Sequence, residues 1–290
     1  MEKKVFIIIV SYNGEHWIEK NLQSLRQSIY PVSTIVIDNK STDTTVSLVQ
    51  KFTEVELIES EENLGFGKAN NLGIRRAIQR GADYVFLLNQ DTWIFPETMK
   101  ALVDTAANNP EFGILSPLHF SADNTTLDAN FERYYQRKTK TISENLIEVP
   151  FVNAAAWLIP KRVIKQVGLF EPLFSHYGED RNYVDRVGYH QFKIGVVKRT
   201  KMVHDRVIQR HFKKDVIQSK FMMLSTVLNV NHSLIMGYLK AFRSVFGLPK
   251  YFSKFYGSSQ ILRLFFTLLF YFAGLKLRII TLYKKRSSYK

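Results

Sequence analysis

The stretch VFLLNQDTWIF, residues 85–95, decides the fold, because an apolar run stops at Asn89, Gln90 and Asp91 and then resumes. A short apolar run of this kind is typical of a strand in the core of a sheet. Three earlier apolar runs alternate with three segments of helical periodicity, at 5–10, 34–39 and 55–60 and at 13–28, 41–52 and 65–81. This alternation predicts an α/β fold, with a mostly parallel, Rossmann-like sheet flanked by helices.

Polar, turn-forming residues follow each of these four strands. They are Ser11 to Gly14, Asp38 and Asn39, Asn63 to Gly67, and Asn89 to Asp91. Open α/β sheets bind ligands outside the carboxyl ends of their strands, so the four clusters are expected to share one crevice. Any one cluster is equally well explained as an ordinary polar turn, but the four together favour a nucleotide-type site. The first strand is followed by neither a P-loop nor a GxGxxG motif, which argues against an ATPase or an ordinary dehydrogenase.

An aspartate placed directly after a buried strand, as Asp91 is, can bind a hard divalent cation. Mg²⁺ or Mn²⁺ usually shares one or two protein carboxylates with phosphate oxygens of a substrate. Such a cation would offset the charge of a departing diphosphate. The alternative is that Asp91 caps the helix expected from Pro96, but residues 92–95 intervene.

The second half of the chain contains GEDRNYVDRVGYH, residues 178–190, which predicts the start of a helix. Glu179 and Asp180 at that start could simply complement the helix dipole. Two adjacent carboxylates near Phe170, Phe174 and Tyr177 instead suggest a general base for a hydroxyl proton, with like charge raising one pKa.

The net charge of +14 is confined to the last third of the chain. Residues 1–185 contain 19 Lys and Arg against 24 Asp and Glu, whereas residues 186–290 contain 21 against 2. In the closing segment 261–290, the longest uncharged stretch, 264–275, has 12 residues, short of the roughly 20 that span a bilayer. An in-plane amphipathic anchor on an anionic membrane is therefore expected. The alternatives are packing on the catalytic domain, a homo-oligomer interface, or nucleic-acid binding; aromatics alternating with basic residues disfavour the last.

The chain has no cysteine, which excludes thiolate metal sites and cysteine nucleophiles. The N-terminal apolar run is only six residues long, at 5–10, and leads into polar turn residues without a cleavage site. We therefore interpret it as a strand and expect the catalytic part to be cytoplasmic.

The ordered set of motifs resembles the family 2 glycosyltransferases with the GT-A fold, and in particular their rhamnosyltransferase-like bacterial branch that builds surface polysaccharides. It covers roughly residues 4–205 and consists of VSYNG, VIDNKSTDTT, ENLGFGKANNLGI, LLNQDT, NAAAWLIPKRVIKQVGLFEP and YGEDRNYVDRVGYH. The alternation of strands and helices ends after about residue 215, so the GT-A catalytic domain is expected to cover residues 1–215. Residues 216–290 are then a basic, amphipathic, helical C-terminal region that associates with the membrane.

The resemblance also assigns roles to individual residues. The residues that would bind the sugar nucleotide are Ser11, Tyr12, Asn13, Asp38, Asn63, Gly65, Gly67, Asn70, Asn89 and Gln90. Asp91 and His204 would hold the Mg²⁺ or Mn²⁺ ion. Asn89 replaces the first Asp of the family's DXD motif, which leaves Asp91 as its only carboxylate.

The implied reaction is an inverting transfer from a nucleotide-diphosphate sugar, either dTDP-rhamnose or a UDP-sugar. Asp180 is the expected general base and Glu179 the second choice, while Asn182 stands where many relatives carry another acid. The acceptor is expected to be a glycan, lipid-linked, at the inner face of the cell membrane. A rival reading is a sugar-phosphate nucleotidyltransferase, but SYNGEHW lacks its Gly-rich basic loop. A second rival is a nonenzymatic protein that binds nucleic acid or membrane through the basic last third of the chain.

Overall fold

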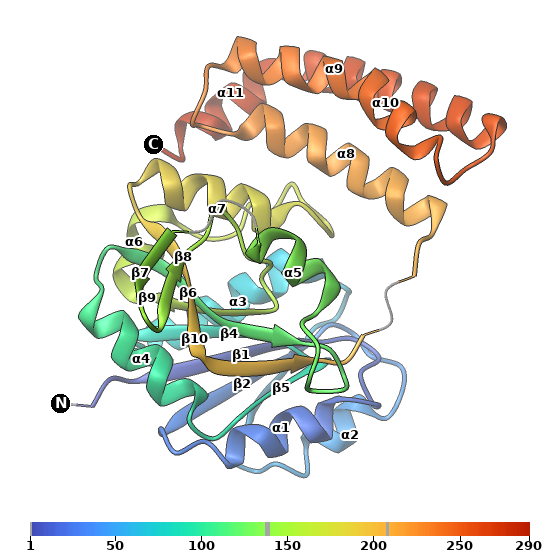
Figure 1. Ribbon diagram of the computed structural model, residues 1–290. Helices are drawn as coiled ribbons and strands as arrows, with labels where there is room; N and C mark the ends of the chain where they lie inside the picture. Colours follow the sequence, from blue (N-terminus) through green and yellow to red (C-terminus); the bar gives the residue numbers. More distant parts are fainter. Residues whose placement is uncertain (1, 137–139, 207–208) are drawn as a thin grey trace. The chain divides into compact units, whose positions relative to one another are not determined.

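The computed structural model describes residues 2–136, 140–206 and 209–290 (Figure 1). The chain forms two compact units that interleave along the sequence. The first unit consists of Met1–Ser175 and Gln191–Val207, and the second of His176–His190 and Ile208–Lys290. The division at residue 215 into a catalytic domain and a C-terminal region remains a prediction about function.

The first unit is built on one sheet with the order β3-β2-β1-β4-β9-β6-β10-β8-β7, and β5 pairs with β10 outside this path. The strands are β1 (Val5–Ser11), β2 (Val32–Asp38), β3 (Glu56–Glu59), β4 (Tyr84–Asn89), β5 (Thr92–Ile94), β6 (Phe112–Phe120), β7 (Lys140–Ser143), β8 (Leu146–Glu148), β9 (Ala156–Pro160) and β10 (Lys193–His204).

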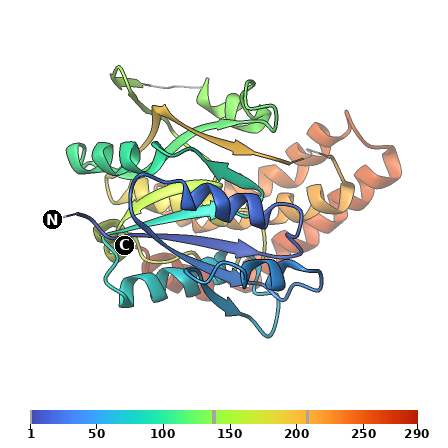
Figure 2. The same ribbon diagram turned by 90° about the horizontal axis from the view of Figure 1, so that it is seen from below.

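The sheet is mixed. The strands β3, β2, β1 and β4 are parallel, as the alternating pattern predicts, and β1 and β2 run side by side in blue in Figure 2. Beyond them, β9 runs antiparallel to both β4 and β6, and β10 runs parallel to β6. The predicted mostly parallel arrangement therefore holds for β3, β2, β1 and β4, where each strand is followed by a crossover helix, and for the pair β6 and β10.

Helices cover both faces of this sheet. The helices of the first unit are α1 (Ile18–Arg26), α2 (Thr45–Val49), α3 (Gly65–Gln79), α4 (Thr98–Asn108), α5 (Ala129–Tyr135) and α6 (Lys161–Val167). Strand side chains alternate between faces, and Val5, Ile7 and Ile9 of β1 join one apolar cluster with residues of α1, α2 and α4. Ile8 faces the other side, where a Cβ on Gly73 of α3 would overlap its side chain.

One helix and one strand differ from the sequence pattern. The segment 13–28 was expected to be helical, but α1 begins only at Ile18, because Asn13 has a positive φ and residues 14–17 form a turn. The short strand β5 was not expected, because three residues carry too little pattern to detect.

The second unit is entirely helical among the residues described. Its helices are α7 (Glu179–Tyr189), α8 (Phe212–Leu228), α9 (Leu234–Phe252), α10 (Ser258–Leu277) and α11 (Ile279–Ser287). The helices α8, α9 and α10 pack on one another (Figure 1). The Arg286 side chain donates to the Val227 carbonyl at 3.1 Å, and the His190 ring lies 3.0 Å from the Tyr289 carbonyl, so α11 and the residues after it hold α7 and α8 together.

The apolar helix of the tail is longer than the 12-residue uncharged stretch in the sequence. By length and composition, α10 is a candidate membrane span, since it has 20 residues and a mean hydropathy of 1.4 in its most apolar window. Only 17% of that window is buried within the protein. Arg263 near its beginning shortens the uncharged run without ending the helix.

Candidate functional site

Hydrogen bonds join the loops that follow β1 and β2. Ser11 and Asp38 are paired in register at the carboxyl ends of these strands, and the Ser11 hydroxyl donates to the buried Asp38 carboxylate at 3.0 Å. The backbone N–H and the hydroxyl of Ser41 donate to the same carboxylate at 2.8 and 2.6 Å. Asn13 accepts from the backbone N–H of Thr42 at 2.8 Å. These bonds fix the shape of the first two loops.

The loop after β4 is tied to the loop after β1 through Gln90. Its side-chain oxygen accepts from the Tyr12 N–H at 2.8 Å, and its amide nitrogen donates to the Tyr12 carbonyl at 3.1 Å. The Tyr12 ring is left 47% exposed. Gly14 makes this contact possible, because a Cβ there would overlap the Gln90 amide.

The loop after β3 is joined to the loop after β2. The Asn39 amide donates to Asn63 at 3.0 Å, and Asn63 also accepts from the Gly65 N–H at 2.9 Å. Gly65 has a φ of 73°, and a Cβ on it would overlap the Ser175 carbonyl oxygen. The four polar clusters thus converge as predicted, while their roles in binding remain predictions.

Two of the residues expected from the resemblance lie within α3 and are covered. Asn70 is buried and its amide donates to the Phe66 carbonyl of its own helix at 3.0 Å, and Gly67 is also buried. Asn89 ends β4, and its carbonyl accepts from the Asn21 amide at 2.9 Å.

The short strand β5 brings Asp91 and His204 together from positions far apart in the sequence. It runs antiparallel to the end of β10 with Thr92 opposite His204. The Asp91 carboxylate consequently lies 3.3 Å from the Nε2 atom of His204. The Asp205 N–H donates to the Asp91 carbonyl at 2.8 Å and locks the two segments in register.

The chemistry of this pair suits a cation. Both ring nitrogens of His204 are buried and have no hydrogen-bond partner among the described residues, whereas the Asp91 side chain is 22% exposed. Buried imidazole nitrogens that form no hydrogen bond are destabilising. A metal ion bound on the exposed side of Asp91 and His204 would relieve that cost. No third His, Asp or Glu completes a metal cluster within the described ranges. The pair fits Mg²⁺ or Mn²⁺ only if substrate phosphate oxygens supply further ligands.

Two further side-chain pairs of the first unit were not identified from the sequence. Arg206 forms two hydrogen bonds to Asp128, at 3.0 and 3.1 Å, and Asp128 also caps α5. On the neighbouring strand, His119 is fully buried and lies 2.8 Å from the Ser116 hydroxyl. Burial holds the pKa of His119 well below its usual value, so this side chain is neutral.

The predicted general base lies at the first turn of α7, in the second unit. Gly178 precedes this helix with a φ of 87°, and the Arg181 N–H donates to Asp180 at 2.7 Å. Burial raises the pKa of Asp180. Glu179 is 5% exposed, and burial together with the neighbouring Asp180 charge raises its pKa to about 7. The like-charge effect expected for one of the two acids contributes to the raised pKa of Glu179, whereas the raised pKa of Asp180 comes from burial.

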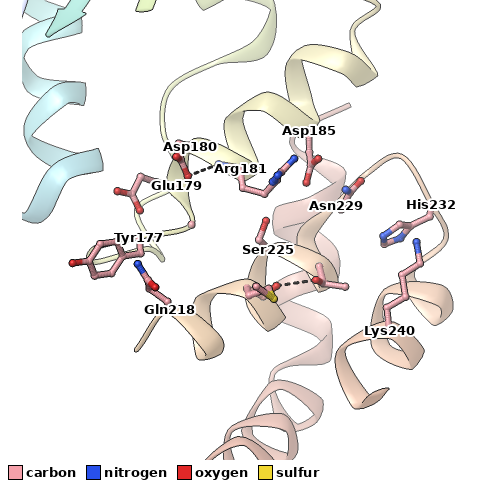
Figure 3. Close-up of a pocket in the computed structure, with 13 residues that line it drawn as sticks. Tyr177, Glu179, Asp180, Arg181, Asp185, Gln218, Ser225, Asn229, His232 and Lys240 are labelled. Carbon is pink, nitrogen blue, oxygen red and sulfur yellow. Dashed lines mark hydrogen bonds between the residues drawn. The ribbon is translucent and has the colours of Figure 1, made fainter. Parts of the chain in front are cut away.

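These acids line a cavity of about 670 Å³ that lies wholly within the second unit (Figure 3). Residues of α7, α8 and α9 contribute to its wall, and the loop between α8 and α9 adds His232. Asp185, one and a half turns after Asp180, also lines it, and burial raises the pKa of Asp185 to about 6. Cavities of this size commonly bind small molecules. The sequence pattern identified the acids but not the α8 and α9 residues opposite them.

Comparison with known proteins places the chain among glycosyltransferases. Residues 6–168 match the model of glycosyl transferase family 2. Over 213 residues the chain is 27% identical to N-acetylglucosaminyl-diphospho-decaprenol L-rhamnosyltransferase of Mycobacterium tuberculosis, covering 63% of this chain and 69% of the relative. Over 216 residues it is 27% identical to dTDP-rhamnosyl transferase RfbF of Shigella flexneri, covering 70% of each.

A solved structure shows the same fold. It is a mannosyltransferase from Pyrobaculum calidifontis in complex with GDP-Man and Mn²⁺, with a TM-score of 0.63 and 15% identity over 100% of this chain and 85% of that one. The fold is therefore GT-A, and the relatives are rhamnosyltransferase-like enzymes of polysaccharide biosynthesis. Since the family model spans more than half of its length, the chain belongs to glycosyl transferase family 2.

Proposed function

We propose that this glycosyltransferase moves a sugar from dTDP-rhamnose or a UDP-sugar to a hydroxyl of a lipid-linked glycan, with inversion at the anomeric carbon. The observation that carries the proposal is the Asp91–His204 pair, held 3.3 Å apart at the carboxyl end of β4. The names of the two relatives support a rhamnosyl donor and, in one case, an acceptor linked to decaprenol through a diphosphate.

The donor nucleoside would lie over the joined loops after β1 and β2. Ser11, Tyr12, Asn13 and Asp38 form its floor, and the exposed Tyr12 ring offers a surface on which a base can stack. The sugar and diphosphate would extend toward Asn63, Gly65, Gly67 and Asn70 on one side and Asn89 and Gln90 on the other.

The diphosphate would reach Asp91 and His204. A divalent cation bound there would offset the negative charge of the departing nucleoside diphosphate. The protein itself contributes the rigid placement of both ligands, because β5 pairing and the Asp205–Asp91 hydrogen bond prevent the two segments from sliding. Asn89 contributes no charge, so the site depends on one carboxylate.

Asp180 would act on the acceptor. It accepts the proton of the acceptor hydroxyl as that oxygen bonds to the anomeric carbon and the bond from this carbon to the diphosphate oxygen breaks. A carboxylate whose pKa is raised by burial is a stronger base than a solvated one, and this favours proton removal near neutral pH. Glu179, with a pKa of about 7, is the neighbouring second candidate.

We further propose that the second unit attaches the enzyme peripherally to the inner face of the cell membrane. Of the 17 large apolar side chains that are exposed among the described residues, 15 lie at or after Met222. Residues 216–290 contain 12 Lys and Arg and no acidic residue. An apolar, basic surface of this composition is suited to anionic lipid, and a homo-oligomer interface is the alternative occupant of the apolar part.

The experiment for the donor site is a thermal-shift series of the full chain with UDP, dTDP, GDP and CDP, each with Mn²⁺ or with EDTA. A ligand that binds only the folded protein raises the melting temperature. We expect one nucleotide to stand out, and EDTA, Asp91→Asn and His204→Gln to remove the Mn²⁺-dependent part of its shift. The control His16→Gln changes an exposed histidine and keeps the shift. Absence of any shift in folded protein contradicts the donor assignment.

The membrane proposal has its own test, which is sedimentation with phosphatidylglycerol vesicles. Phe242 and Phe246 are 42% and 53% exposed on α9. Replacing both by Ser should lower vesicle binding at least about tenfold, since each buried aromatic contributes on the order of 1.5–3 kcal/mol. The control Ile29→Ser removes an apolar side chain that is 59% exposed in the first unit and should leave binding unchanged. Equal loss in both variants would contradict a specific face.

A further inference from the structure

The turn between β4 and β5 is held by a buried side chain of α1. Asn21 is 0% exposed, and its amide nitrogen donates to the Asn89 carbonyl at 2.9 Å and to the Thr92 carbonyl at 2.7 Å. These two carbonyls mark the ends of the four-residue segment that contains Gln90 and Asp91. One side chain therefore fastens both ends of the turn that carries the proposed metal ligand.

Only the nitrogen of an amide can serve both carbonyls in this way. A primary amide has two N–H donors on one atom, whereas a hydroxyl has one donor and a hydrocarbon has none. The Oδ1 atom of Asn21 is buried and forms no hydrogen bond among the described residues. A buried unpaired acceptor is destabilising, and a hydrocarbon side chain at this core position would avoid that penalty. What the asparagine offers in return is the pair of bonds to the turn.

Other side chains of α1 contact the rest of β5. The Ser24 hydroxyl donates to the Asn21 carbonyl at 2.7 Å and accepts from the Ile94 N–H at 3.3 Å. The ammonium nitrogen of Lys20 lies 3.2 Å from the centroid of the Trp93 ring. Every residue of the three-residue strand β5 is thus contacted by a side chain of α1.

The position of β5 in turn sets the position of Asp91 relative to His204. Among the described strands β5 pairs with β10 alone, with Thr92 opposite His204. A ladder of three residues is too short to be stable by itself, so its register depends on support from its other neighbours. That support comes from α1, and the Asp205 N–H completes it by donating to the Asp91 carbonyl at 2.8 Å.

From these contacts we infer that Asn21 is a positioning residue for the metal site. Its two hydrogen bonds hold the turn so that the Asp91 carboxylate stays 3.3 Å from Nε2 of His204. Asn21 acts through the backbone of the turn and is not itself a ligand. Residues that orient metal ligands commonly change metal affinity about 10–100-fold when they are replaced. The inference rests on the proposed metal-dependent transfer and deepens it, because the site has a single carboxylate whose placement it explains.

The test compares Asn21→Leu with the matched control Asn71→Leu. Asn71 of α3 is 2% exposed, and its side chain donates to the Phe170 carbonyl at 2.8 Å and accepts from the Phe170 N–H at 2.9 Å. Each substitution removes two bonds from a buried helix asparagine to a distant backbone segment of the first unit, but only Asn21→Leu affects the β4–β5 turn. Asn21→Ser is a milder second variant, because one hydroxyl proton can serve only one carbonyl.

The first measurement needs no metal. Deuterium exchange in EDTA is followed by mass spectrometry on peptides that cover residues 202–206 and therefore the Asp205 amide. Two lost hydrogen bonds of ordinary strength correspond to local opening that is about tenfold easier, so we expect about tenfold faster exchange in Asn21→Leu. Asn21→Ser should give a smaller increase, and Asn71→Leu should stay within about twofold of the parent protein.

The second measurement is Mn²⁺ binding, followed by the loss of the paramagnetic resonance signal of the free ion, with saturating dTDP and separately with UDP. We expect Asn21→Leu to weaken Mn²⁺ binding about tenfold or more, and Asn71→Leu to leave it within about twofold. Nucleotide binding in EDTA should fall less than Mn²⁺ binding in Asn21→Leu, since the loops after β1 and β2 are held by hydrogen bonds of their own.

The inference is overturned if the Asp205 amide exchanges at the parent rate in Asn21→Leu, or if its exchange is faster while Mn²⁺ affinity is unchanged. Equal loss of Mn²⁺ affinity in Asn21→Leu and Asn71→Leu would also overturn it, because general destabilisation would then be the cause. A parent protein that binds Mn²⁺ with neither nucleotide refutes the proposed metal-dependent function itself. Parent binding that persists unchanged in Asn21→Leu refutes only the role of Asn21.

Discussion

Replacing Glu179 by Gln should make the protein more stable at alkaline pH. Glu179 is 5% exposed, and its pKa is raised from 4.5 to about 7. Below pH 4.5 the side chain is protonated in both the folded and the unfolded protein. Between pH 4.5 and about 7, the unfolded protein has released the proton that the folded protein still holds, so the free energy of unfolding falls across this range. The loss is complete once the pH has risen through the folded pKa of about 7. Gln cannot ionise and does not suffer this loss.

The magnitude follows from the size of the pKa shift. Each pKa unit corresponds to about 1.4 kcal/mol, so the variant should gain about 2–3 kcal/mol relative to the parent protein between pH 5 and pH 8. The three tryptophans, Trp17, Trp93 and Trp157, all lie in the first unit. In urea unfolding, tryptophan fluorescence therefore reports the first unit. Ellipticity at 222 nm reports the helices of both units, so a change in the ellipticity transition without a change in the fluorescence transition is assigned to the second unit.

A surface acid provides the matched control. Glu62 is exposed, and Glu62→Gln should shift stability by the same small amount, within about 0.5 kcal/mol, at both pH values. If the difference in unfolding free energy between Glu179→Gln and the parent protein also stays constant between pH 5 and pH 8, the pKa of Glu179 is not raised in the folded protein. The assignment of α7 as the carrier of a perturbed acid pair would then be refuted.

Three other substitutions follow from the geometry. Gly65→Ala should destabilise the first unit by about 1–3 kcal/mol, measured by tryptophan fluorescence, because its φ of 73° and the Ser175 carbonyl leave no room for a Cβ. Gln90→Ala breaks both hydrogen bonds to Tyr12 and should raise the KM for the donor more than it lowers kcat, since it loosens the β1 loop; equal effects would argue against that role. The acid limb of kcat/KM should lie above the ordinary aspartate value of 3.8 because burial raises the pKa of Asp180, and Asp180→Asn should abolish transfer rather than move the limb.

The sequence was sufficient to predict the half of the sheet that contains β1 to β4. The apolar runs that form β1 to β4 and their polar ends made the convergence of the loops predictable, because parallel strands place their carboxyl ends together. The proximity of Asp91 and His204 could be suspected only from the family resemblance, since 112 residues lie between them in the sequence and the strand β5 that joins them has three residues. Short strands of this kind are specified by tertiary pairing, not by local pattern.

The mixed sheet and the cavity escaped prediction for related reasons. Nothing local in residues 156–160 distinguishes an antiparallel strand from a parallel one, because β9 is buried on both sides and therefore uniformly apolar. Ser225 and Lys240 carry ordinary helix-surface chemistry in the sequence. They gain meaning only when α8 and α9 fold against α7.

The interleaving of the two units constrains how the protein can be made. When α7 leaves the ribosome, β10 has not yet been synthesised, so the sheet of the first unit still lacks the strand that pairs with β5, β6 and β8. The partners of α7 in the second unit follow only from residue 208 onward, and His190 meets the Tyr289 carbonyl 99 residues later. The apolar side chains of α7 therefore stay uncovered until the segments that follow it, β10 and then α8 to α11, have been synthesised. Synthesis of this enzyme thus passes through a long interval in which chaperone protection is most needed, and no single cut of the gene would divide the chain into two halves that each hold one complete unit.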